Sequence, residues 1–195
     1  SHELRTPLAI LQGELEAIQD GVRRMTPEAL QSLQSEVMIL KKMVDDLHQL
    51  ALSDAGALRY QMMNCDLTEL LNHVTTAFQQ RFEAAGLTLT CDCPHQAPFY
   101  GDINRLSQLC HNLLENSLRY THAPGELSVT LSAQSNGWYL EFSDSAPGLT
   151  DEQQQHIFDR FYRAENSRNR ASGGSGLGLA ICRAITDAHQ GEISC

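Results

Sequence analysis

The sequence predicts an α+β protein in which two amphipathic helices precede a domain of mixed helices and antiparallel strands. Three observations support this prediction. Apolar residues recur every three or four positions over the first fifty residues, the stretch 87–93 alternates apolar with polar residues, and Asn136-Gly137 separates two further alternating runs. With 195 residues, 42% of them hydrophobic, the chain can bury a core and has room for one large or two small domains.

The two opening helices are predicted from heptad spacing. The first apolar series steps by four and three and consists of Leu4, Leu8, Leu11, Leu15, Ile18 and Val22. After a break at 21–25, Thr26-Pro27-Glu28 has the pattern of an N-cap, a first helical residue and an acid favoured by the helix dipole. A second series runs from Leu30 to Ala51. The pair should form a helical hairpin, and two hairpins could bury both stripes in a four-helix bundle. Packing against the rest of the same chain is the alternative.

The pattern changes after residues 53–56. Helices are expected at 67–85, 103–120 and 151–158, with a last helix opened by 173–178 and running to about 189. Strands are expected at 87–93, 126–134 and 138–144, and another should begin at 192–195. We therefore expect a helical domain over 1–56, a linker over 57–66 and a second domain over 67–195.

Composition excludes several classes of function. A formal net charge of −10 disfavours binding to nucleic acid and to anionic membranes. No apolar run reaches the roughly 18 residues of a membrane span, so we expect no membrane contact by this chain. The only lysines, Lys41 and Lys42, have no glycine beside them, which excludes a P-loop and the strand lysine of protein Ser/Thr kinases. Six cysteines without a Cys-x-x-Cys pair favour free thiols over a disulfide framework.

His2 is the first candidate for chemistry. It points away from the apolar seam of its helix, and Thr6 follows one turn later on the same face. An imidazole on the solvent side is free to act as a nucleophile or phosphate acceptor, and Glu3 beside it could orient or deprotonate it. For a lone histidine, the alternative is an idle surface residue.

Asn112 and Asn116 lie one turn apart in the expected helix 103–120, in a polar strip that also contains Arg119. Side-chain amide oxygens beside a cation suit a hydrated Mg²⁺ that carries a triphosphate. A solvated helix face is the alternative for these residues.

Two further segments suit a nucleotide. Asp144 is an isolated carboxylate at a strand end, where it could accept a hydrogen bond from the exocyclic amine of adenine, or could be a plain turn aspartate. The glycine-rich stretch 173–178 opens a helix, so its backbone amides could bind an anion without any lysine. A basic island precedes it and suits a lid over phosphates, or a solvated loop; its members are Arg160, Arg163, Arg168 and Arg170.

Taken in order, five segments resemble the motifs of the sensor histidine kinases of two-component systems. Ser1-His-Glu-Leu-Arg-Thr-Pro-Leu8 resembles the H box, and Asn112-Leu-Leu-Glu-Asn-Ser-Leu-Arg-Tyr120 resembles the N box. Asp144-Ser-Ala-Pro-Gly148 resembles the G1 box, and Phe158-Asp-Arg-Phe-Tyr-Arg163 resembles the F box. Gly173-Gly-Ser-Gly-Leu-Gly-Leu179 resembles the G2 box. Ala146 and Pro147 depart from the usual glycine pattern of the G1 box, which puts the shape of that loop in doubt.

The resemblance implies a dimerisation and histidine-phosphotransfer hairpin followed by a Bergerat-type (GHKL) α/β sandwich that binds ATP and Mg²⁺. His2 would accept the phosphoryl group with help from Glu3, and Asn116 would hold Mg²⁺. Thr6 would place the water that dephosphorylates the response regulator to which the kinase passes its phosphoryl group. Arg163 would reach the terminal phosphate. The remaining implied nucleotide-site residues are Asn112, Arg119, Tyr120, Asp144, Gly148, Gly174, Gly176, Leu177 and Gly178.

The implied partners are a second copy of the chain and the receiver domain of a cognate response regulator. The family also implies a sensor and membrane-spanning part before Ser1, a strand or two after Cys195, and a place on the cytoplasmic side of an inner membrane. The sequence is therefore expected to be a fragment.

Two rival functions stay open. GHKL ATPases of the chaperone, gyrase or mismatch-repair kind carry a water-activating Glu four residues before the Mg²⁺-binding Asn, where this chain has Asn112. Glu115 is nearby but lies about 100° round the helix from Asn116. The other rival is a dimerisation scaffold without catalysis, which the intact His2, Asn116 and Asp144 disfavour.

Overall fold

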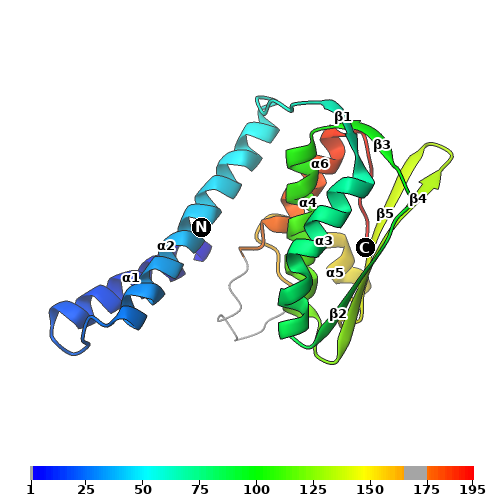
Figure 1. The fold of residues 1–195 in the computed structure, drawn as a ribbon. Helices are drawn as coiled ribbons and strands as arrows, with labels where there is room; N and C mark the ends of the chain where they lie inside the picture. The colour runs from blue at the N-terminus through cyan, green and yellow to red at the C-terminus, as the bar shows by residue number, and fades with distance from the viewer. Residues whose placement is uncertain (1, 165–174) are drawn as a thin grey trace. The chain divides into compact units, whose positions relative to one another are not determined.

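A computed structural model describes residues 2–164 and 175–195, with side chains from residue 4 onward (Figure 1). The chain divides into two compact units. The first comprises Ser1–Leu58 and Asp159–Leu177, and the second comprises Arg59–Phe158 and Gly178–Cys195. In the described part of the chain, no helix has the length and apolar character that crossing a bilayer requires.

The first unit contains the predicted helical hairpin, made of α1 (His2–Gln19) and α2 (Pro27–Asp54). The predicted start of α2 is confirmed, because Ala29 N–H donates to Thr26 Oγ1 at 3.2 Å and Pro27 is the first helical residue. The prediction that Val22 continues the first seam is wrong. Gly21 adopts a φ of +70°, which ends the helix, and Val22 beyond it is 82% exposed.

A single copy of the hairpin covers only part of its apolar surface. Ala29, Leu33 and Met43 of α2 are buried. In contrast, Leu8 on α1 is 57% exposed and Val37 on α2 is 52% exposed. Other large apolar residues of the two helices that stay exposed are Ile10, Leu15, Leu30, Met38 and Val44. The hairpin therefore retains an apolar face that a further partner could bury.

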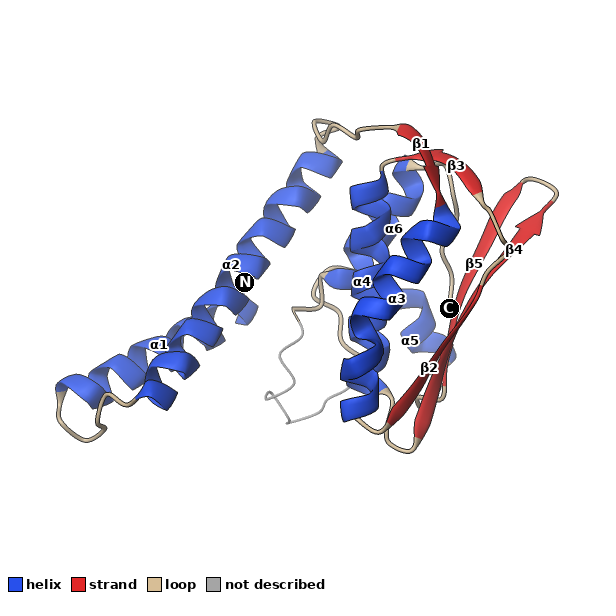
Figure 2. Ribbon diagram, in the orientation of Figure 1, coloured by secondary structure: helices blue, strands red, loops and turns tan. Residues whose placement is uncertain are grey.

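The second unit packs helices on one side of a three-stranded sheet (Figures 1 and 2). Its strands are β2 (Leu87–Asp92), β4 (Gly125–Gln134) and β5 (Gly137–Asp144), in the order β2-β4-β5. β2 runs parallel to β4, and β4 runs antiparallel to β5. The helices are α3 (Leu67–Ala84), α4 (Ile103–Tyr120), α5 (Asp151–His156) and α6 (Gly178–Ala188). The α+β prediction is confirmed.

The core of the second unit follows the expected periodicities. Alternate residues of β4, namely Leu127, Val129 and Leu131, are buried toward the helices. The opposing helices contribute buried side chains at three- and four-residue spacing, and those that are fully buried include Leu71, Val74, Phe82, Leu114, Ile181 and Ile185.

Two features differ from the sequence-based expectations. A two-stranded ladder of β1 (Met63–Asp66) and β3 (Pro98–Gly101) was not predicted and includes part of the expected linker. The last helix, in contrast, begins at Gly178, the final residue of the stretch that was expected to open it. The expected strand at 192–195 is wrong for the structure described, because a strand exists only with a ladder partner and these residues pair with none of the described strands.

The N-terminus of α4 is held to two distant segments through Asp102. One carboxylate oxygen caps the first turn of α4, and the other accepts from Gln61 N–H at 2.8 Å. The Asp102 N–H donates to His189 Nε2 at 2.9 Å, while His189 Nδ1 lies 2.7 Å from the Ile185 carbonyl oxygen. Because Nε2 accepts, we assign the ring proton to Nδ1. This arrangement fixes the start of the helix that carries Asn112 and Asn116.

Candidate functional site

The acceptor helix places two of the predicted residues one turn apart. His2 is the first residue of α1, and Thr6 follows four positions later. The side chains of His2 and Glu3 lie outside the described residues. Thr6 is half-buried, and Pro7 after it is buried within the first two turns of α1. The helix therefore brings Thr6 to the same face as position 2, as the sequence predicts.

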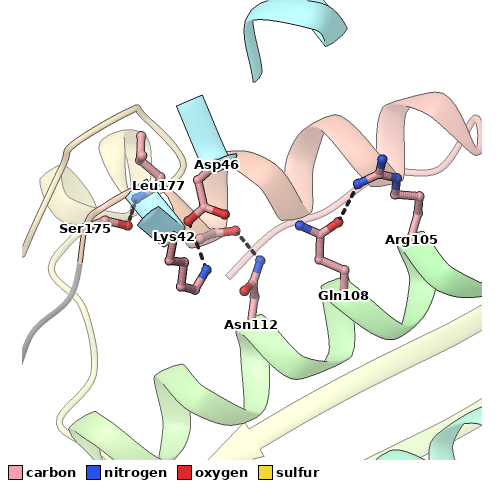
Figure 3. A network of polar contacts seen from close by, with 8 residues as sticks. Lys42, Asp46, Arg105, Gln108, Asn112, Ser175 and Leu177 are labelled. Atoms are coloured by element: carbon pink, nitrogen blue, oxygen red, sulfur yellow. Dashed lines mark hydrogen bonds and ion pairs between the residues drawn. The ribbon is translucent and has the colours of Figure 1, made fainter. Parts of the chain in front are cut away.

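On α4, Asn112 and Asn116 have different environments. The Nδ2 of Asn112 donates to the carbonyl oxygen of Gly178 at 3.3 Å, drawn as a dashed line in Figure 3. Gly178 is the first residue of α6, so Asn112 connects α4 to the start of that helix. Asn116 is half-buried one turn later, and its side chain makes no hydrogen bond to any described residue. Its amide oxygen is therefore available to a ligand.

Asp144 is not the isolated carboxylate that the sequence suggests. Ser117 Oγ of α4 donates to Asp144 Oδ2 at 2.6 Å, and Ala146 N–H donates to Oδ1 at 3.2 Å. Ser117 is buried, so the hydroxyl is held where it meets the end of β5. Each carboxylate oxygen keeps a further lone pair for an incoming donor. The arrangement thus fixes the direction in which Asp144 can accept a hydrogen bond from a base.

The loop after Asp144 tolerates its unusual residues. Ser145 pairs with Glu126 of β4 through its own N–H and through its hydroxyl, at 3.0 and 2.9 Å. Ala146 does not adopt a left-handed φ, so the loss of glycine there causes no strain in this conformation. A Cβ built on Gly148 meets no atom within 4 Å. The described conformation therefore gives no steric reason for glycine at 148.

The predicted F and G2 segments meet in the first unit. Phe161 N–H donates to the Gly176 carbonyl oxygen at 2.8 Å. Gly176 has a φ of +68°, and a Cβ there would lie 2.8 Å from the Phe161 backbone. Phe161 itself has a φ of +64°, a conformation that costs a non-glycine residue about 1–3 kcal/mol. This backbone contact connects residue 161 of the F segment to residue 176 of the G2 segment, and only glycine fits at position 176.

The other predicted residues of these segments are placed as follows. Leu177 is fully buried, and its backbone N–H donates to Ser175 Oγ at 3.3 Å (Figure 3). Arg163 is half-buried in the first unit. Arg119, which is exposed, and Tyr120, which is half-buried, end α4. Gly174, Arg168 and Arg170 lie outside the described residues.

Arg160 also belongs to the first unit and pairs with the end of α2. Its guanidinium lies 2.5 Å from Asp54 Oδ1. The hydrogen bond from Arg160 holds the pKa of the Asp54 carboxyl below its usual range. Both side chains are exposed, so the pair adds little stability, but it neutralises one cation of the basic island.

Known proteins resemble this chain in sequence and in fold. Residues 1–56 match the model of the His Kinase A (phospho-acceptor) domain, and residues 101–195 match that of the histidine kinase-, DNA gyrase B- and HSP90-like ATPase. The solved structure of the histidine kinase AdeS of Acinetobacter baumannii is 34% identical, with a TM-score of 0.83 over 96% of this chain and 87% of that one. The chain belongs to the histidine kinase family.

Two further relatives extend the comparison. Over 193 residues the chain is 58% identical to the signal transduction histidine-protein kinase BaeS of Escherichia coli K12. The aligned region covers 99% of this chain and 41% of BaeS. The chain thus spans about two fifths of that relative's length. The structure of full-length ShkA in complex with AMPPNP is 25% identical, with a TM-score of 0.70 over 96% of this chain and 39% of that one.

For a histidine kinase, the environment of Glu115 is informative because related ATPases use a glutamate to activate water. Arg81 of α3 binds both carboxylate oxygens of Glu115, at 2.6 and 3.0 Å. This hydrogen bonding is the main cause that lowers the pKa of Glu115. A carboxylate that is ionised, paired and directed toward α3 is a poor general base for a water near Asn116.

Sequence reasoning missed two residues of this candidate site. Ser117 was not singled out, although a hydroxyl on the buried face of an amphipathic helix, following Cys110 and Leu114, needs a hydrogen-bond partner. The role of Phe161 in holding Gly176 depends on backbone dihedral angles that no side-chain pattern reveals.

Proposed function

We propose that this chain is the catalytic core of a sensor histidine kinase, which transfers the terminal phosphoryl group of ATP to His2 and then passes it to an aspartate of a response regulator. The proposal rests on membership of the histidine kinase family and on one structural observation, the absence of a base for water activation at positions 112 and 115. The position where related ATPases carry a base is Asn112, and its amide is bonded to Gly178. The neighbouring Glu115 is bonded to Arg81. An ATP site without a base for water favours transfer to another acceptor.

The described residues suit a nucleotide. Asp144, oriented by Ser117, would accept the exocyclic amine of adenine. The ATPase family model and the AMPPNP complex of ShkA support binding of ATP by this unit. Backbone amides at the start of α6 would bind the phosphates. The resemblance to the F box would give Arg163 a contact with the terminal phosphate.

The amide oxygen of Asn116 fits a hydrated Mg²⁺. This cation keeps several waters and takes few protein ligands when phosphates supply the rest, so a single amide at the end of a polar strip is sufficient. When bound, Mg²⁺ neutralises charge that develops on the transferred phosphoryl group. Asn116 would hold it, and Arg119, in the last turn of α4, would add positive charge nearby.

The helical hairpin would supply the acceptor. A ring nitrogen of His2 attacks the terminal phosphorus, the bond to the bridging oxygen breaks and ADP leaves, while Glu3 takes or orients the proton on the other nitrogen. Thr6, one turn further along α1, would hold the water that later hydrolyses the phosphorylated regulator, using its hydroxyl as donor and acceptor. Under this assignment Thr6→Ala loses regulator dephosphorylation and keeps transfer.

A second copy of the chain is the proposed partner for the hairpin. The half-covered face that includes Leu8 and Val37 suits pairing of two hairpins into the four-helix bundle. Leu33, Gln34, Val37 and Met38 line an open groove of about 450 Å³ on α2. We also propose that the chain acts on the cytoplasmic side of an inner membrane, as part of a longer sensor protein, and that the receiver domain of a response regulator docks near Thr6.

The function is tested by incubating the chain with labelled ATP and Mg²⁺. Wild type and His73→Gln, a change at an exposed histidine of α3, should both incorporate label. His2→Gln should bind nucleotide and incorporate none. Nucleotide binding without label in the wild type and in both variants would contradict kinase activity.

A further inference from the structure

The buried face of β2 ends in two thiols. Leu87 and Leu89 of this strand are buried. Cys91 is the next residue on that face, Cys93 follows directly after the last strand residue, and both cysteines are half-buried. Side chains two residues apart in a strand point to the same face, which here packs against α3. The core face of this edge strand therefore ends with Cys91, and Cys93 lies just past the strand. Both side chains are partly exposed to solvent.

The two sulfurs are in direct contact. Cys91 Sγ and Cys93 Sγ lie 3.4 Å apart, so one S–H donates to the other sulfur. Burial, followed by the neighbouring Cys91, raises the pKa of the Cys93 thiol to about 12. Cys93 is therefore protonated at neutral pH, and all six cysteines of the chain are free thiols. A ligand at this pair must displace protons from sulfur.

The structure shows neither of the two commonest fates of paired cysteines. The two sulfurs lie 3.4 Å apart, well beyond the S–S bond length of about 2.05 Å, so the pair is not a disulfide here. Tetrahedral zinc needs further protein ligands, and within residues 2–164 and 175–195 no group of three His, Cys, Asp or Glu side chains is placed to hold a metal.

The sulfur separation instead matches a single atom that is bound by both sulfurs at a narrow angle. If each bond is about 2.3 Å, as in zinc thiolates, a separation of 3.4 Å gives an angle at the bridging atom of about 95°. Trivalent arsenic is pyramidal and bonds at angles near this value, whereas tetrahedral zinc and linear copper(I) need wider ones. An organic substituent on arsenic fills its third position, so no third protein ligand is required.

We propose that Cys91 and Cys93 form a binding site for monosubstituted trivalent arsenicals. The reaction is a condensation in which two As–S bonds form and the arsenic–oxygen bond breaks. The two thiol protons leave with that oxygen as one water molecule. Arsenic stays trivalent and no oxidant is consumed. The proposal is independent of the kinase function, because neither cysteine belongs to the nucleotide or acceptor site.

The probe is phenylarsine oxide, added to the intact chain and followed by mass spectrometry under native conditions. Wild type should take up one phenylarsenic group with loss of one water. An excess of a monothiol should leave the adduct in place, whereas a dithiol should remove it, because only a chelating competitor matches two linked sulfurs. Cys91→Ser and Cys93→Ser should each reduce retention at least tenfold. Cys65→Ser and Cys195→Ser, at cysteines outside the pair, should retain the adduct.

Thermal unfolding of each variant verifies that it folds. If one serine variant does not fold, the test uses the wild-type chain alone. The adduct should then protect both Cys91 and Cys93 from alkylation by maleimide, which is measured by mass spectrometry of the peptide that contains them. The proposal is overturned if the Cys91→Ser/Cys93→Ser variant keeps the adduct, if a monothiol removes it from wild type, or if the protected thiols are Cys110 and Cys182.

Discussion

Ser117 Oγ lies 2.6 Å from Asp144 Oδ2, and this hydrogen bond connects the last turn of α4 to the end of β5, 27 positions further along the chain. It explains how a strand-end carboxylate can be held in one orientation. Asp144 sits opposite Leu127 in the ladder, and the bond to Ser117 adds an anchor from α4. The position of adenine should therefore depend on a residue that does not itself contact the base.

The first prediction follows from this bond. Ser117→Ala removes a hydrogen bond to a charged group, which contributes about 1.5–3 kcal/mol when fully formed. We expect ATP to bind roughly tenfold more weakly, since part of this energy is recovered from water. Isothermal titration of the variant against Ser132→Ala, an exposed serine of β4, measures the difference. Equal affinities would show that Ser117 has no part in orienting Asp144.

The second prediction concerns Gly176. An added Cβ would lie 2.8 Å from the Phe161 backbone at a φ of +68°, so Gly176→Ala must break the contact between the F and G2 segments. We expect phosphorylation to fall at least tenfold. Gly148→Ala, where a Cβ meets nothing within 4 Å, is the matched control for folding and should melt at the wild-type temperature. Wild-type phosphorylation by Gly176→Ala would mean that this contact is not needed for activity.

The third prediction concerns pH. Glu115 has a lowered pKa in the folded chain because Arg81 hydrogen-bonds to it. Its contribution to stability is therefore present above the pKa of the unfolded chain and is lost as pH falls through the lower, folded value. Glu115→Gln should lose stability at pH 7 and little at pH 3. The side chains are 49% and 45% exposed, so the loss is expected to be under about 1 kcal/mol.

Chemical denaturation at the two pH values measures that effect, with Glu69→Gln on the first turn of α3 as the control. Glu115→Gln should also keep phosphorylation, because Glu115 is bound to Arg81 and is not a base for the reaction. A large loss of phosphorylation would instead assign Glu115 a catalytic role.

The fourth prediction concerns dimerisation of the chain through the helical hairpin. Val37 is 52% exposed in a single chain and would be buried in the bundle, so Val37→Asp would bury a charge at a cost of several kcal/mol per subunit, on the order of the penalty for an unpaired ion. Sedimentation should show a wild-type dimer and a monomeric variant. Ser35→Asp, an exposed polar position on the same helix, should stay dimeric. A monomeric wild type at high concentration would contradict the four-helix bundle.

Local patterns in the sequence were sufficient for most helices and strands. The predicted helix 103–120 has the same bounds as α4, because Asp102 caps its start and the apolar spacing is regular throughout. The pair β4 and β5 was predicted to within one residue from Asn136-Gly137. Both signals lie within the segments that they describe.

Features that depend on distant partners could not be predicted in this way. β1 and β3 are four residues each and are separated by more than thirty positions, so neither has a period of its own to detect. The partners of Ser117 and Glu115 lie on other elements, and their identity depends on tertiary packing. In the candidate site, residue types pointed to nucleotide chemistry, whereas orientation was visible only in the structure.

The central claim is that His2 accepts phosphate from ATP, and the chemical stability of the label tests it most directly. After incubation with labelled ATP and Mg²⁺, the phosphorylated chain is divided between acid and alkali and the remaining label is counted. A phosphoryl group on an imidazole nitrogen is lost in acid and kept in alkali. We therefore predict acid-labile, alkali-stable label in wild type and none in His2→Gln. Label that survives acid, or that persists in His2→Gln, would contradict the account.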